Sequence, residues 1–210
     1  MKTRVLLADD HSLFAQAVAG MLTERYEIVD IVADGRALQA AVREHKPDVA
    51  IVDVTMPLMS GLDSVRTLGR DRWRPKVIFL TMHADPEIAR ECFKCGCSAF
   101  VTKDLSCTEL MAAIDSVMAN EVYVSSNIAD SLVKEATLPA RVSLEGTDLT
   151  GRQREILQLL AEGKTMKEIA TDMNLSTRTV EWHKYRMMQI LRVRRNADLI
   201  RHAIRMKLVI

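Results

Sequence analysis

The stretch Val49-Ala-Ile-Val-Asp53-Val-Thr-Met-Pro57 joins a short apolar run to an aspartate and then to a loop. Apolar runs of this length are typical of strands that are buried on both faces of a sheet. Similar runs, separated by segments with helical spacing of apolar residues, lie to either side of it at residues 4–8, 27–32, 76–81 and 99–102. The alternation predicts an α/β fold: a doubly wound parallel sheet of five strands with helices on both faces.

The chain divides into three predicted parts. Residues 1–120 form the α/β domain, whose helices we expect at residues 13–24, 35–45, 61–70, 86–94 and 107–118. Residues 121–146 read as a linker with a short helix near 127–136. Residues 147–210 are predicted to form a small all-α domain, with helices at 151–162, 166–173, 177–191 and 196–206. Thr150 followed by Gln153 is a capping-box pattern at the start of this last part.

Charge is distributed unevenly along the 210 residues, although the formal net charge is only +1. Residues 147–210 hold 13 lysines and arginines against 7 aspartates and glutamates, a net +6, and the remaining residues carry a net −5. An acidic first part suits metal or phosphate chemistry, and a basic second part suits a polyanion. No apolar run approaches the roughly 20 residues that span a bilayer, so we expect no membrane partner and a cytoplasmic protein.

The four cysteines are Cys92, Cys95, Cys97 and Cys107. The first three have a spacing that suggests a metal site, but no fourth ligand follows at a usual zinc spacing. We therefore predict small buried side chains in a reducing compartment.

Polar side chains stand at the ends of the predicted strands. Asp9 and Asp10 close the first strand, Asp53 the third and Thr81 the fourth, and Lys103 follows the fifth. Open parallel sheets bind ligands at the carboxyl ends of their strands. We therefore expect three carboxylates, a hydroxyl and an ammonium to meet in one crevice.

This set of groups suits phosphoryl transfer to a carboxylate. Clustered carboxylates repel one another unless a hard cation such as Mg²⁺ joins them. Asp53 could then attack phosphorus as the nucleophile, while the metal neutralises charge on the phosphoryl oxygens. Lys103 would pair with the phosphate, and the Thr81 hydroxyl would donate a hydrogen bond to another of its oxygens.

Residues 1–120 resemble the receiver domains of two-component response regulators. The resemblance rests on four motifs, which are Leu7-Ala-Asp-Asp-His11, Asp53-Val-Thr-Met-Pro57 with Gly61, Thr81-Met-His-Ala84 and Lys103-Asp104. It implies a flavodoxin-like fold and phosphorylation of Asp53 by a histidine kinase. It also implies that Phe100 rotates with Thr81 on phosphorylation. The Mg²⁺ ligands that it implies are Asp10, Asp53 and the main-chain carbonyl of Thr55, with Asp9 assisting.

Residues 166–186 read as a helix, a tight turn and a second helix. Apolar side chains recur along both helices at helical spacing, so they are predicted to form one small core. Glu181, Trp182, Lys184 and Tyr185 lie mostly away from that apolar stripe, and an exposed Trp–Tyr pair beside cations is unusual for a merely solvated face. In a helix-turn-helix, residues placed this way enter the major groove.

Residues 147–210 resemble the LuxR-type DNA-binding domain, which places the chain in the NarL/FixJ class of response regulators. The resemblance implies that Glu181, Trp182 and Tyr185 face the bases. Phosphate contacts are expected from Lys164, Thr165, Lys167, Thr177, Arg178, Thr179 and Lys184. Trp182 has an alternative, which is a ring lying flat on the first helix, and His183 is expected to pack against neighbouring helices.

These features predict a phosphorylation-dependent transcriptional regulator that binds operator DNA as a homodimer. We expect that the protein is not an enzyme, except that its receiver domain promotes its own phosphorylation and dephosphorylation. One alternative is a DNA-binding regulator that ignores phosphate and uses the receiver domain for dimerisation. A hydrolase of the haloacid dehalogenase type is a poorer match, because it requires an aspartate at position 55, where this chain has Thr55.

Overall fold

The computed structural model describes residues 2–68, 73–82, 85–104, 106–137, 149–206 and 208–209. Its contacts divide the chain into two compact units, residues 1–137 and 138–210. Among the described residues, no helix has both the length and the apolar character needed to cross a bilayer.

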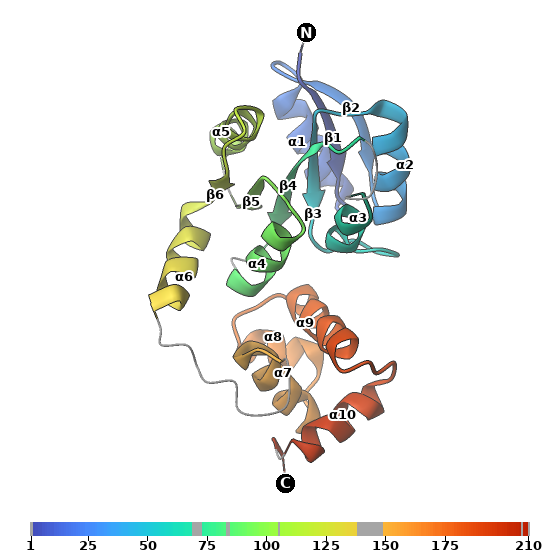
Figure 1. Ribbon diagram of the computed structural model, residues 1–210, viewed down its shortest axis with the longest axis vertical. Coiled ribbons are helices and arrows are strands. Elements are labelled where there is room, and N and C mark those ends of the chain that lie inside the picture. The colour runs from blue at the N-terminus through green and yellow to red at the C-terminus, as the bar shows by residue number, and fades with distance from the viewer. Residues whose placement is uncertain are drawn as a thin grey trace. The chain divides into compact units, whose positions relative to one another are not determined.

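The first unit is a parallel sheet with helices on both faces (Figure 1). Its strands are β1 (Arg4–Ala8), β2 (Glu27–Val32), β3 (Val49–Asp53), β4 (Lys76–Thr81), β5 (Ala99–Thr102) and β6 (Tyr123–Val124). Its helices are α1 (Ser12–Leu22), α2 (Gly35–His45), α3 (Gly61–Leu68), α4 (Pro86–Lys94), α5 (Cys107–Met118) and α6 (Ser126–Thr137). The strand order is β2-β1-β3-β4-β5-β6, which confirms the doubly wound fold class.

The predicted number of strands is wrong, because the sheet has six strands and not five. The additional strand, β6, has only two residues and pairs in parallel with β5 through Ala99 and Phe100. Two residues are too few to show a strand periodicity. Its pairing covers part of the backbone of β5, which would otherwise be the edge of the sheet.

Alternation along the strands explains the two buried faces of the sheet. Residues such as Leu7 and Ile51 share one core with α1 and α5. Their neighbours Leu6 and Val52 are just as buried, so the opposite face is covered as well. Figure 1 shows α2, α3 and α4 on that second side. Strands buried on both faces are consistent with the continuous apolar runs in the sequence.

Local capping sets where the helices of this unit begin. Asp85 precedes α4 and accepts hydrogen bonds from the backbone of Glu87 and Ile88, with Pro86 in the first helical position. Ser106 caps α5, and its hydroxyl oxygen accepts a hydrogen bond from the Glu109 backbone N–H at 3.2 Å. The predicted helix after Gly61 was expected to reach residue 70. Residues 69–72 lie outside the described part of the chain.

In its described residues, the regular structure of the second unit consists of helices. Its helices are α7 (Gly151–Ala161), α8 (Met166–Asp172), α9 (Thr177–Ile190) and α10 (Asn196–Arg205). Thr150 and Gln153 form the predicted capping box of α7, and Thr165 with Glu168 forms a second one at α8. All four helices contribute to one core, which includes Ile156, Ile169 and Leu199.

Candidate phosphoacceptor site and DNA interface

Four side chains at the carboxyl ends of β1 and β3 form an acidic group. Asp9, Asp10, His11 and Asp53 each offer one ligand atom, and these atoms lie within 4.8 Å of one another. Register explains their meeting, because Ala8 of β1 pairs with Val52 of β3 and both strands end at the same edge. The parallel sheet therefore brings together the three aspartates that the sequence predicted to meet.

Lys103 reaches into this group from the end of β5. Its Nζ lies 2.6 Å from Asp9 Oδ2 and 2.8 Å from Asp53 Oδ2, and its side chain is only 3% exposed. The Phe14 ring lies below the same ammonium, with its centroid 4.9 Å away. A buried ammonium needs such partners, because an isolated charge is costly in a low dielectric.

Burial and hydrogen-bond partners act on the pKa of Asp53 in opposite directions. Burial raises its pKa above the ordinary value, while Lys103 and the Thr55 N–H act to lower it. The Thr55 backbone N–H donates to Asp53 Oδ1 at 3.0 Å. Since Lys103 holds the other oxygen, both carboxylate oxygens of Asp53 have a defined partner.

Gly61 keeps the backbone of α3 close to Asp53. A Cβ at Gly61 would lie 2.0 Å from the Asp53 carbonyl oxygen and 2.7 Å from a Val52 methyl. Any larger residue would therefore force α3 away from the end of β3. This close approach accounts for a glycine at that position of the motif.

The donor set suits a hard divalent cation. Three carboxylates and one ammonium leave a net charge of −2, and carboxylate oxygens are the ligands that Mg²⁺ prefers. His11 was not assigned a role from the sequence, yet its Nδ1 lies 3.1 Å from Asp9 Oδ1 and 3.4 Å from Asp10 Oδ1. The sequence could have predicted that His11 lies at this acidic group, because it directly follows Asp10 at the end of β1.

Thr81 and Phe100, the predicted switch pair, lie on adjacent strands. Thr81 ends β4, is 6% exposed, and pairs in register with Thr102 of β5. Its carbonyl accepts a hydrogen bond from the Lys103 backbone N–H at 2.7 Å. Phe100 is fully buried in β5. The last two residues of the Thr81 motif, 83 and 84, lie outside the described part of the chain.

The cysteines form no disulfide. Cys92 and Cys97 are buried, as predicted, whereas Cys95 and Cys107 are half-buried. Burial raises the pKa of Cys97 to about 12. Among the described residues, no cysteine belongs to a cluster that could hold a metal ion.

The predicted DNA-contacting residues of α8 and α9 differ in exposure. Lys167, Glu181 and Tyr185 are exposed, as is Thr165. Four others are half-buried, namely Lys164, Thr177, Arg178 and Lys184. Thr179 is buried, and its backbone N–H and hydroxyl both contact the Oγ of the helix cap Ser176 at 2.9 Å. Thr179 therefore belongs to the start of α9 and not to its outer face.

Trp182 departs from the expected exposed pair. Its side chain is 7% exposed, whereas Tyr185 is 55% exposed. The indole ring lies edge-on against His183, with 5.0 Å between the centroids, and His183 is fully buried as expected. The prediction of an exposed Trp182 is thus wrong, because a large ring can fold back against neighbouring groups from a position outside the apolar stripe. The base contact of Trp182 stays a prediction.

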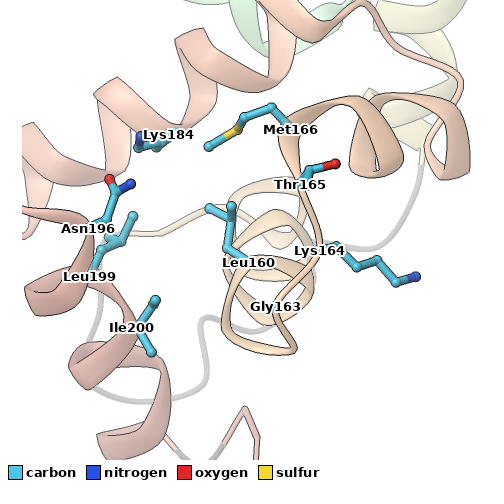
Figure 2. Close-up of a pocket in the computed structure, with 9 residues that line it drawn as sticks. All are labelled: Leu160, Gly163, Lys164, Thr165, Met166, Lys184, Asn196, Leu199 and Ile200. Carbon is cyan, nitrogen blue, oxygen red and sulfur yellow. The ribbon is translucent and has the colours of Figure 1, made fainter.

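A pocket of about 350 Å³ lies among the four helices of this unit (Figure 2). Leu160, Met166 and Leu199 give it apolar walls, and three predicted phosphate-contact residues, Lys164, Thr165 and Lys184, also line it. Figure 2 shows the Lys164 side chain extending away from the other lining residues. Its Nζ lies 2.7 Å from Asp172 Oδ2, so a phosphate would have to compete with that carboxylate.

Comparison with known proteins covers both units. The response regulator receiver domain family matches residues 5–115, and the luxR family of bacterial regulatory proteins matches residues 147–203. The transcriptional regulatory protein MctR of Rhizobium johnstonii is 31% identical over 97% of this chain and 94% of its own length. The oxygen regulatory protein NreC of Staphylococcus carnosus is 30% identical over 98% and 99%.

Among solved structures, RcsB dimers bound to two parallel DNAs match in fold, with a TM-score of 0.62 at 23% identity and 98% coverage of both chains. At that identity the likeness concerns the fold alone. The family matches and the two relatives carry the assignment of this chain. It belongs to the NarL/LuxR-type two-component response regulators, transcriptional regulators that join a receiver domain to a LuxR-type DNA-binding domain.

Proposed function

We propose that Asp53 accepts a phosphoryl group from a histidine kinase, and that this phosphorylation controls the binding of operator DNA. The observation that carries the proposal is the position of the Lys103 ammonium, 2.6 Å from Asp9 and 2.8 Å from Asp53. A buried ammonium beside a buried nucleophile is placed to pair with a phosphoryl oxygen once one is attached.

The chemistry is an in-line displacement at phosphorus. An Asp53 oxygen attacks, the bond to the donor's leaving oxygen or nitrogen breaks, and the donor leaves with the electron pair. Lys103 then exchanges its contact with Asp53 Oδ2 for one with the phosphoryl group, and the Thr81 hydroxyl donates to a second oxygen. Asp10, Asp53 and the Thr55 carbonyl would hold Mg²⁺, with Asp9 assisting, and the ion would neutralise charge on the phosphoryl oxygens.

The response begins at Thr81 and Phe100 on adjacent strands. We propose that Thr81 moves toward the phosphoryl group and that Phe100 changes rotamer in the space that this creates. The phosphoryl group must interact more favourably with the switched conformation than with the unswitched one. A group that interacts equally with both conformations does not shift the equilibrium between them.

In the second unit, Glu181 and Tyr185 are proposed to contact base edges, because both are exposed on α9. The exposed or half-buried Lys164, Thr165, Lys167, Thr177, Arg178 and Lys184 are proposed to contact phosphates. A homodimer would place two such helices on two half-sites. We assign this activity to the cytoplasm, where the phosphodonors and the DNA are both available.

We propose that the chain consists of a receiver at residues 1–120, a connecting segment at 121–146 and a DNA-binding domain at 147–210. The first part of the connecting segment, β6 and α6, packs with the receiver unit. The receiver is proposed to promote its own phosphorylation and dephosphorylation and no other turnover.

The test is the intact mass of the protein after incubation with Mg²⁺ and acetyl phosphate. One phosphate adduct on the wild type, absent from Asp53→Asn, supports the proposal. Adducts of equal yield on both proteins would remove Asp53 as the acceptor. No adduct on either would favour the alternative regulator, which uses its receiver only to dimerise.

A further inference from the structure

An open hollow of about 770 Å³ lies where the loop after α9 meets α10. Its lining carries five arginines and, among the described residues, one carboxylate; these are Arg192, Arg194, Arg195, Arg201, Arg205 and Asp198. The resulting net charge is +4, with His202 of the same lining taken as neutral. Cations gathered in a concave surface produce a positive potential that draws anions from solution.

The backbone holds the loop side of the hollow in place. Arg192 adopts a left-handed conformation, with φ of 54°, directly after α9. Its N–H donates to the Gln189 carbonyl at 3.2 Å, and the N–H of Val193 donates to Met188 at 3.0 Å. Val193 also packs against the core of the unit. The guanidinium groups of this loop therefore extend from an anchored turn.

Asp198 positions two of the arginines. Its carboxylate oxygens lie 3.0 Å and 3.2 Å from the Nε and Nη2 of Arg195, and it also accepts a hydrogen bond from Arg201. The hydrogen bond from Arg195 is the main reason that the pKa of Asp198 lies below its ordinary value, so this carboxylate stays charged at neutral pH. Asp198 thus balances one charge and fixes the direction of two guanidinium groups.

The other three arginines of the hollow remain available. Arg192 and Arg194 of the loop and Arg205 of α10 are exposed. Within the described part of the chain, no ion pair joins them to a carboxylate. Their charge is therefore not compensated by any described residue, and these arginines line the same hollow from two different elements.

We propose that this hollow is a binding site for a soluble oligophosphate. A guanidinium group matches a phosphate oxygen pair with two parallel hydrogen bonds, and several phosphoryl groups in a row supply several such pairs. A concave site with two walls suits a compact ligand. It is also separate from the proposed base-contacting residues, since Arg192 lies beyond the end of α9 at Ile190, which is itself five residues, roughly 7 Å along the helix, past Tyr185.

The proposal is tested by isothermal titration of the full chain with inorganic tripolyphosphate in Mg²⁺-free buffer. The triple variant Arg192→Gln, Arg194→Gln, Arg205→Gln should bind at least 30-fold more weakly than the wild type. The matched control removes three charges from the proposed DNA face, Lys164→Gln, Lys167→Gln, Lys184→Gln, and should change the affinity less than 3-fold. An unchanged melting temperature establishes that both variants are folded.

A second triple variant, with lysine at the same three positions, keeps the charge but removes the two-pronged hydrogen bonds. It should bind about 5-fold more weakly than the wild type, and it allows the test even if the glutamine variant is unstable. Equal losses in the arginine variant and the lysine-face control would overturn the proposal in favour of diffuse attraction. A variant of the hollow that weakens DNA binding but not tripolyphosphate binding would also overturn it, by making the hollow a contact for the DNA backbone.

Discussion

Lys103 is the residue on which the acidic site most depends, because its buried ammonium contacts both Asp9 and Asp53. Replacement by methionine leaves those carboxylates close together without their cation. Breaking a buried ion pair in this way typically costs about 3 kcal/mol. We expect Lys103→Met to lower the free energy of unfolding by about that amount in urea titrations with EDTA.

Added Mg²⁺ provides the control for Lys103→Met. A divalent cation restores positive charge between the carboxylates, so the deficit of the variant should shrink at millimolar Mg²⁺. If Mg²⁺ stabilised the wild type and the variant equally, the stabilising role of Lys103 would have to be unrelated to the charge of the site.

Cys97 makes stability depend on pH in the alkaline range. Its folded pKa is raised to about 12 from an ordinary 9.0, mainly because the thiol is buried. A raised pKa means that the stabilisation is complete below pH 9 and is lost as pH rises toward 12. At pH 11 the Cys97 thiol should lower the free energy of unfolding by about 2–3 kcal/mol, relative to its value at pH 8.

The measurement is urea unfolding of the wild type and Cys97→Ala at pH 8 and pH 11. The alanine variant lacks the ionising thiol, so its stability should fall less between the two pH values. Parallel losses in the two proteins would show that Cys97 is accessible and ionises in the folded state.

Trp182 gives a direct optical test of the buried ring on α9. The chain has two tryptophans, so Trp73→Phe reports on Trp182 and Trp182→Phe reports on Trp73, which is 47% exposed. We expect acrylamide to quench Trp182 several-fold less than Trp73, because the quencher must reach the ring. Equal quenching of the two tryptophans would show that the Trp182 ring is exposed, and Trp182 would again be a candidate for contact with the bases.

At the scale of elements, β6 and α6 extend the receiver beyond the five predicted strands. Ser125 is buried between them, and its N–H donates to the carbonyl of the switch residue Phe100 at 3.2 Å. The Asn127 side chain donates to Thr102 Oγ1 at 3.2 Å. These contacts tie the start of α6 to the strand that carries Phe100, so a change in β5 would be felt at α6.

Ile128 tests whether α6 packs this way. It is fully buried, and a buried isoleucine truncated to alanine typically costs 2–5 kcal/mol. We expect Ile128→Ala to lower the free energy of unfolding of the receiver unit by about 3 kcal/mol in urea. Val122→Ala, at a 68% exposed position nearby, should stay within about 0.5 kcal/mol. An equally small effect of Ile128→Ala would mean that α6 does not pack on the receiver in solution.

The elements also show what sequence can and cannot predict. The run ending at Asp53 is recognisable because a strand buried on both faces must be apolar throughout. Convergence of Asp9, Asp53 and Lys103 then follows from parallel strands ending at one edge. The strand at Tyr123 is invisible in the pattern, since its pairing depends on the open edge of β5. The spacing of apolar residues along α9 likewise could not predict whether the Trp182 side chain is buried, because burial depends on the size of the ring and on its neighbours.

At the scale of the whole molecule, charge connects the two units to their proposed ligands. The acidic part of the chain holds the site proposed for Mg²⁺ and the phosphoryl group, and residues 147–210, which include the DNA-binding domain, carry a net +6. Binding of DNA releases condensed counterions, so the logarithm of the association constant falls with the logarithm of salt concentration by about 0.9 for each phosphate neutralised. The slope therefore counts phosphate contacts, and it does so independently of the affinity.

This count tests whether phosphorylation recruits a second DNA-binding domain. If phosphorylated Asp53 pairs two chains on two half-sites, the number of neutralised phosphates doubles. The salt slope should then become about twice as steep, whereas Asp53→Asn should keep the shallow slope with phosphodonor present. Fluorescence anisotropy of a labelled operator duplex between 50 and 200 mM salt measures both slopes. Tighter binding with an unchanged slope would instead mean that phosphorylation frees a single domain, because affinity would rise without any new contact to phosphate.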